Sequence, residues 1–255
     1  MVTRASAVRV GLIFPELLGT YGDRGNAVVL VERCRRRGID AELVEVAAAD
    51  AIPESLDVYL FGGGEDDPQV MAAAGMRASR AAIEAAHRAG AVVFAVCAGF
   101  QLIGHTYEAG DGERLDGLGL VDLATSAGPH RLIGEVVVEP DPSLGLPVLT
   151  GFENHGGRTT LGPGERPLGR VRSGGGNGVG GVDGVLRERI VGTYLHGPVL
   201  PRNPALADRM LGWVLGAKLA PLEDELVERL RAERLEDASA TGWRARRRDL
   251  HLNRG

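Results

Sequence analysis

The sequence contains little lysine and little cysteine, and each shortage excludes a class of function. Among the 29 lysine and arginine residues, only Lys218 is a lysine. Leu219 follows it, so the motif G-x-x-x-x-G-K-[ST] is absent and we expect no mononucleotide-binding P-loop. Two cysteines, Cys34 and Cys97, are too few for a disulfide framework. The sequence therefore favours a protein of a reducing compartment.

Long apolar segments and excess positive charge are also missing. Segment 1–10 has no apolar core of signal-peptide length. Segment 89–107 carries no formal charge, but glycine, glutamine and histidine interrupt its second half, so we expect a buried strand, a sharp turn and a helix there. The net charge of −5 argues against a nucleic-acid-binding surface. We expect a cytoplasmic protein without a transmembrane segment.

What is present is a globular composition in which short apolar runs alternate with helical patterns. Hydrophobic residues make up 44% and charged residues 25% of the 255 residues. Helices are expected over 27–37 and 76–89, and strands between and around them, at 8–14, 41–46, 58–61 and 91–96. This alternation predicts a doubly wound α/β domain with a mostly parallel sheet flanked by helices.

From about residue 116 to residue 194 the helical signal fades and β-type runs alternate with turns. We expect β-hairpin additions packed on the sheet. Gly176, Gly178 and Gly181 have the spacing G-x-G-x-x-G, but no helix follows them. A dinucleotide site requires that helix, so a hairpin loop is the better interpretation.

The C-terminal part is expected to be helical and then irregular. Asn203 and Pro204 are typical of the N-cap and first position of a helix, and a second amphipathic helix is expected from about 222 to 235. We expect a main domain over 1–215, a helical extension over 216–240 and a basic, flexible tail over 241–255.

Cys97 is the strongest candidate for a nucleophile. It stands where an apolar strand meets a glycine-containing turn that opens a helix, in VVFAVCAGFQLIG. Such a turn exposes the side chain, a helix N-terminus lowers a thiol's pKa, and the N–H of Ala98 faces the position of an oxyanion. The alternative is a buried, inert cysteine, which is the interpretation we give to Cys34.

A thiol nucleophile needs a base, and His196 is the best placed of the six histidines. It ends the strand-like run RIVGTYL, and open α/β sheets keep their sites at the carboxyl ends of strands. His155, in GFENHGGRT, is the second candidate. Gly63 and Gly64 also follow a strand, and their backbone N–H groups could approach a substrate oxygen.

Five motifs together resemble a known family. The segments TYGDRGN, GGGEDDPQ, CAGFQLIG, GFENHGGRT and TYLHGPVLPRNPALAD are similar to those of the GatD type, the glutamine amidotransferase subunit of lipid II isoglutaminyl synthase. The resemblance covers about residues 8 to 215. It implies a class I glutamine amidotransferase fold of the cobyric acid synthase type, so that residues 1–215 would form the amidotransferase domain.

The resemblance also implies roles for individual residues. Cys97 would be the nucleophile and His196 its base, in agreement with the choice made from the residues. Arg131 would contact the glutamine substrate, and a planar guanidinium suits an α-carboxylate; the alternative is a solvated surface arginine. Gly63 and Gly64 would lie beside the second oxyanion donor. No glutamate stands two residues after His196, so the resemblance implies a Cys-His dyad without the third member of a triad.

By this resemblance the chain would hydrolyse L-glutamine and pass ammonia to a Mur-ligase-like partner, MurT, in a heterodimer. The partner would amidate lipid II, a step of peptidoglycan synthesis, at the inner face of the membrane. No cofactor or metal is expected in this chain, and ATP and a metal would bind to the partner. Three alternatives remain: a glutaminase subunit serving a cobyrinic-acid-type acceptor, a DJ-1-like cysteine hydrolase, and a silent stabilising subunit.

Overall fold

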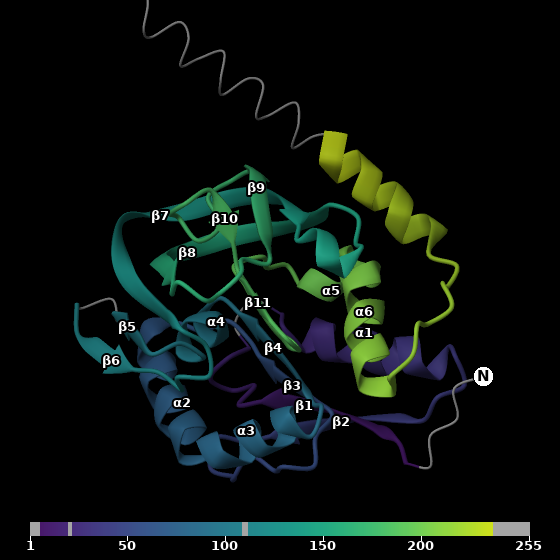
Figure 1. Ribbon diagram of the computed structural model, residues 1–255, viewed down its shortest axis with the longest axis horizontal. Coiled ribbons are helices and arrows are strands. Elements are labelled where there is room, and N and C mark those ends of the chain that lie inside the picture. Colours follow the sequence, from purple (N-terminus) through teal and green to yellow (C-terminus); the bar gives the residue numbers. More distant parts are fainter. Residues whose placement is uncertain (1–5, 20–21, 109–111, 237–255) are drawn as a thin grey trace, which may run out of the picture.

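Two six-stranded sheets organise the structure, a computed structural model that describes residues 6–19, 22–108 and 112–236 (Figure 1). The first sheet has the order β11-β12-β4-β3-β1-β2. Only the pair of β11 and β12 in it is antiparallel. The predicted, mostly parallel sheet is thus confirmed. Its strands are β1 (Val8–Ile13), β2 (Ala41–Val46), β3 (Val58–Phe61), β4 (Val92–Val96), β11 (Val185–Arg187) and β12 (Ile190–Thr193).

Helices cover both faces of this sheet. Strands β3 and β4 are buried along their whole length, as expected for central strands that are apolar on both faces. In the sheet, β2 lies on one side of β1, and β3 and β4 lie on the other side. The connections from β1 to β2 and from β3 to β4 therefore cross the sheet in opposite directions, and because such crossovers are right-handed, their helices lie on opposite faces. Figure 1 shows α2 (Asp66–Ala78) and α3 (Arg80–Arg88) together on one side, and α1 (Arg24–Arg35) with α6 (Pro204–Leu215) on the other.

The helix expected over 76–89 is wrong in its bounds. The chain forms two helices there, because Ser79 leaves the helical region at φ −100° and ψ 9° and separates α2 from α3. Helix α2 begins ten residues earlier than expected, at Asp66. Pro68 stands in its first turn, where a missing N–H costs no intrahelical bond, so the proline is compatible with an earlier start.

The expected hairpins form a second sheet of their own. Long strands β7 (Leu123–Pro140) and β8 (Leu149–Leu161) pair antiparallel and dominate it, after which come β9 (Gly169–Ser173) and β10 (Val182–Asp183). The short strands β5 (Thr106–Glu108) and β6 (Arg114–Asp116) complete it, and β5 runs parallel to β7. A short 3₁₀ helix, Pro142–Leu144, joins β7 and β8. Figure 1 shows β7, β8, β9 and β10 above the first sheet, and β5 and β6 to one side of it.

The C-terminal helices follow the expected pattern. Asn203 is the N-cap of α6, Pro204 opens it, and Gly216 ends it at φ +61°. A four-residue helix, α5 (Val199–Arg202), precedes it. The amphipathic helix expected over 222–235 runs from 225 to 236, whereas the basic tail 241–255 lies outside the described residues. No helix in the described part of the chain has the length and apolarity that a membrane crossing requires.

Candidate active site

Cys97 occupies a strained turn between β4 and α4 (Ala98–Leu102). Its backbone has φ +51° and ψ −106°, a conformation that non-glycine residues adopt only when the surroundings enforce it. The Cys97 N–H donates to the carbonyl of Thr193 on the adjacent strand at 2.9 Å. Gly99 follows closely, and a side chain there would bring its Cβ within 2.5 Å of the Phe61 carbonyl oxygen. The predicted strand-to-helix elbow is therefore present and is held from both neighbouring strands.

The thiol of Cys97 differs from expectation in its burial and its acidity. Only 5% of Cys97 is exposed, so the elbow does not present the side chain to solvent. Burial, followed by the charge of Asp23, raises the Cys97 pKa to about 12. The Ala98 N–H and the charge of Arg131 act in the opposite direction. The expected lowering of the thiol pKa is wrong because α4 has only five residues and desolvation exceeds the effect of its N-terminus.

His196 follows the end of β12, the strand that neighbours β4. Its N–H and C=O pair with the C=O and N–H of Phe152 on β8 at 2.8 and 3.1 Å, so the first and second sheets together fix its backbone. The side chain is buried. Burial, then the charges of His155 and Arg131, lowers the His196 pKa to about 4. The imidazole is therefore neutral at pH 7, as a proton acceptor must be.

A small cavity opens beside Cys97 and brings together four of the residues expected in the site: Cys97, Ala98, Gly64 and Arg131. The second histidine candidate, His155, also lines it. His196 and Gly63 are not among its described lining residues. The remaining lining residues are Glu65, Gln69, Gln101, Asn154 and Gly156.

The N–H of Gly63 is engaged by a buried carboxyl group. It donates to Asp23 Oδ2 at 2.7 Å, so in this arrangement Gly63 does not offer its N–H to a substrate oxygen. Burial raises the Asp23 pKa to about 6, and the Gly63 N–H opposes this rise. Asp23 was not among the predicted site residues, although it stands in the glycine-containing loop after β1, at the carboxyl edge of the sheet where such sites gather.

Arg131 lies within β7 and not at a strand start. The pairing of β7 with β8 shifts register between Ala127 and Leu132, and such an irregularity redirects side chains. Arg131 Nη2 donates to the backbone carbonyl and Oδ1 of Asn154, both at 3.1 Å. Arg131 lines the Cys97 cavity, while the residue itself stays exposed.

A chain of buried polar groups extends from two residues that line the cavity, Gln69 and Gln101. Gln69 Nε2 donates to Gln101 Oε1 at 2.7 Å, and Gln101 Nε2 donates to the Tyr194 hydroxyl at 3.1 Å. The same hydroxyl lies 2.7 Å from Thr159 Oγ1. No local pattern in the sequence predicts this chain of contacts, because its members come from α2, α4, β8 and the segment after β12.

His155 is held tightly on the same side. Its ring stacks on Tyr194 with centroids 3.6 Å apart, and Nδ1 lies 3.1 Å from the Gly157 carbonyl oxygen. Nε2 lies 3.7 Å from Glu153 Oε2. Glu153 is itself fixed by the N–H groups of Gly175 and Gly176 at 2.8 and 2.9 Å.

The glycine-rich loop after β9 is a hairpin loop, as expected. Strands β9 and β10 flank it and pair antiparallel, and Gly176, Gly178 and Gly181 all have positive φ. Two of its N–H groups bind the Glu153 carboxylate, so the loop holds a side chain of the protein. In the described part of the chain, no three histidine, cysteine, aspartate or glutamate side chains gather in a way that could hold a metal ion.

Residues 9–204 match the model of the CobB/CobQ-like glutamine amidotransferase domain, and the chain belongs to this family. It is therefore an enzyme of the glutamine amidotransferase class, and a DJ-1-like hydrolase is excluded. Two solved structures share the fold. A glutamine amidotransferase from Thermotoga maritima has a TM-score of 0.51 at 17% identity and covers 89% of this chain and 93% of its own. The PurLQS structure from the same organism has a TM-score of 0.52 at 15% identity, over 83% and 96%.

Among curated relatives, the chain is similar to subunit GatD of glutamine-hydrolysing lipid II isoglutaminyl synthase. The Staphylococcus aureus protein is 34% identical over 83% of this chain and 86% of its own length. The Streptococcus pneumoniae protein is also 34% identical, over 83% and 82%. A probable cobyric acid synthase from Methanopyrus kandleri is equally identical at 34%, but the match covers only 40% of that protein.

Proposed function

We propose that this chain is the glutaminase subunit of a lipid II isoglutaminyl synthase and that it supplies ammonia to a Mur-ligase-like partner, MurT. The observation that carries the proposal is the cavity in which Cys97 on its strained elbow, the Ala98 N–H and Arg131 meet. The similarity to the two GatD subunits over more than four-fifths of their length supports the choice among amidotransferases. A cobyric-acid-type acceptor is less well supported, because the chain spans less than half of that relative.

The proposed reaction begins with a protonated thiol and a neutral imidazole. Cys97 Sγ attacks the side-chain carbonyl carbon of L-glutamine while His196 accepts the thiol proton. His196 then donates that proton to the departing ammonia, which leaves a thioester on Cys97. Water attacks the thioester with His196 as base and releases glutamate. At pH 7 His196 is neutral and can accept a proton, and the Cys97 thiol, with a pKa of about 12, needs such a base.

Other cavity residues have positioning roles in this proposal. The Ala98 N–H would stabilise the oxyanion, because it already lies against the Cys97 sulfur. Gly64 lines the cavity and is the better placed of the two glycines for the second oxyanion contact, since the Gly63 N–H is bound to Asp23. Arg131 would pair with the substrate α-carboxylate.

The assignment of carboxylate activation to the partner follows from the P-loop motif that this sequence lacks. Amidation of the D-glutamate α-carboxylate requires activation of that carboxylate, and this sequence has no P-loop lysine. ATP and a metal are therefore assigned to the partner, and no cofactor to this chain. Because lipid II resides in the membrane, the heterodimer would work at its inner face, and this chain would reach the membrane through the partner.

The test is glutamine- and ATP-dependent amidation of lipid II by the purified heterodimer. Cys97→Ala should abolish amidation with glutamine but leave amidation with added ammonium chloride unchanged, because the partner's site is intact. Cys34→Ala, a change at a buried position in α1 away from the cavity, is the matched control and should keep both activities. An equal loss of amidation with glutamine and with ammonium chloride would show that Cys97 has a structural role in the complex.

A further inference from the structure

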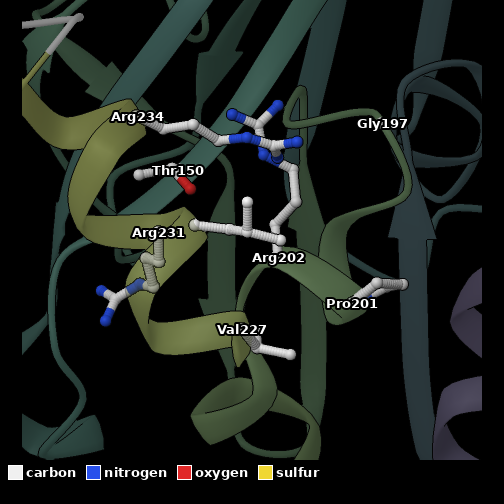
Figure 2. Close-up of a pocket in the computed structure, with 8 residues that line it drawn as sticks. Thr150, Gly197, Pro201, Arg202, Val227, Arg231 and Arg234 are labelled. Carbon is white, nitrogen blue, oxygen red and sulfur yellow. The ribbon is translucent and has the colours of Figure 1, made fainter. Parts of the chain in front are cut away.

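A second pocket lies between helix 225–236 and the segment that follows His196 (Figure 2). It has a volume of about 210 Å³ and is distinct from the Cys97 cavity, with which it shares no lining residue. We propose that it binds a phosphate or diphosphate group and that its occupation steadies the segment carrying His196. It is lined by Thr150, Gly197, Pro201, Arg202, Val227, Leu230, Arg231 and Arg234.

The charge of the lining favours an anion. Three of the eight lining residues are arginines and none is acidic. Arg202 pairs with Glu135 and Arg231 with Glu228, but these carboxylates are 46% and 54% exposed and lie outside the lining. Solvent screens such half-exposed partners, so they leave much of the positive field in the pocket.

One of the arginines, Arg202, carries a donor that nothing in the described chain satisfies. Its side chain is 8% exposed, and its Nε atom is buried without a hydrogen-bond partner among the described residues. A buried donor without a partner is costly, and a ligand oxygen would remove that cost. In Figure 2 the side chains of Arg202 and Arg234 point toward the same end of the pocket, whereas Arg231 points the other way. A guanidinium fork is the geometry that proteins use for phosphate oxygens.

The pocket is connected directly to His196. Gly197, the next residue, has φ +113°, and a Cβ there would lie 3.5 Å from Arg202 Nη1. Asn203, at the end of the same segment, binds the backbone N–H and C=O of Thr150 at 2.9 and 2.8 Å. An anion held by Arg202 and Arg234 would therefore join helix 225–236 to the segment from 197 to 203.

Calorimetric titration of the full chain with inorganic pyrophosphate tests the binding. Arg234→Met should weaken it about tenfold or more, the effect of losing one charge-assisted contact. Arg234 is exposed, so this variant should keep the fold. Arg229→Met removes the same charge from the same helix outside the pocket and should change the affinity less than about twofold.

Separate titrations with ADP and farnesyl diphosphate distinguish a nucleotide from an isoprenoid diphosphate as the natural source. Absence of binding by all three compounds, or equal weakening in both variants, would overturn the proposal.

Hydrogen–deuterium exchange tests the connection to His196. Pyrophosphate should slow amide exchange across residues 197–203 in the wild type and in Arg229→Met, but not in Arg234→Met. Binding that leaves the exchange of this segment unchanged would contradict the coupling. Both measurements are independent of glutaminase activity, so they stand whether or not the acceptor is lipid II.

Discussion

At the scale of single residues, the acidity of Cys97 sets the conditions for its chemistry. A thiol with a pKa of about 12 carries almost no thiolate at pH 7, so the free enzyme should react slowly with an alkylating reagent. In a Cys34→Ala background, we expect the rate of Cys97 alkylation by iodoacetamide to rise about tenfold per pH unit up to pH 9.5. Intact-protein mass measures this rate. A rate that levels off near neutral pH would show a depressed thiol pKa instead.

The choice of base separates His196 from His155. Removal of a general acid/base usually costs about 10²- to 10⁴-fold in turnover, so His196→Ala should reduce kcat for glutamine hydrolysis by that amount. Stacked on Tyr194 and near the Glu153 carboxylate, His155 is built into the cavity wall. His155→Ala should therefore act mainly on stability and substrate affinity. A larger loss of kcat in His155→Ala than in His196→Ala would reverse the assignment.

Arg131 should act on recognition of glutamine. Loss of a charge-assisted pair with the α-carboxylate costs about 1.5 to 3 kcal/mol, so Arg131→Ala should raise KM for glutamine by roughly 10- to 150-fold. Arg172→Ala is the control, since Arg172 also lies in the second sheet but pairs with Glu139 outside the cavity. Steady-state glutaminase kinetics report both. An unchanged KM in Arg131→Ala would make it a surface residue.

At the scale of elements, the elbow depends on the close approach of α4 to β3. Gly99→Ala would force its Cβ into the Phe61 carbonyl oxygen and Cβ, at 2.5 and 2.7 Å, so the turn at Cys97 must shift. We expect a destabilisation of about 1–3 kcal/mol and a loss of glutaminase activity larger than the stability change explains. Gly164→Ala is the control, because no atom lies within 4 Å of its added Cβ. Denaturant unfolding and glutaminase assays of both variants measure the difference.

The sequence predicted the elements whose signal is local. Buried parallel strands are continuous apolar runs, so β3 and β4 were evident, and so was the elbow that follows β4. The division between α2 and α3 was missed because Ser79 breaks the helix without a glycine or proline to mark it. The sequence did not predict that the second sheet forms a layer of its own, because the parallel pairing of β5 with β7 produces no periodic pattern in the sequence.

The distinction between local sequence signals and contacts between distant residues also holds within the site. Cys97, His196 and Arg131 were predicted from short motifs, since each motif lies at the end of a strand or resembles a family pattern. Asp23 was not predicted, because its hydrogen bond with the Gly63 N–H joins residues that are forty positions apart in the sequence. The direction of the Cys97 pKa shift was wrong for a related reason: burial is a property of the tertiary structure and cannot be obtained from the position of one helix N-terminus.

At the scale of the whole molecule, Asp183 joins the two sheets and is fully buried. It lies on β10, accepts a hydrogen bond from the Thr193 hydroxyl on β12 at 2.5 Å, and accepts another from the Tyr194 N–H at 3.2 Å. Burial raises its pKa to about 7, against the effect of these donors. The carboxyl group is thus more easily protonated in the folded state than in the unfolded state.

The sign of the resulting pH dependence follows from linkage. A group whose folded pKa is raised contributes stability below its unfolded pKa of 3.8, and this contribution is lost as the pH rises toward about 7. Asp183 should therefore make the free energy of unfolding fall with pH by up to about 1.4 kcal/mol per pH unit between pH 4 and 7. Asp183→Asn should flatten this dependence in urea unfolding measured across that range.

Asp141→Asn is the opposite control: the Ser143 hydrogen bonds lower the Asp141 pKa, so Asp141 contributes stability above pH 3.8 that is lost on acidification. If Asp183→Asn leaves the slope between pH 4 and 7 unchanged, Asp183 is ionised in the folded protein and the ionised carboxylate is stabilised by its contacts between the sheets.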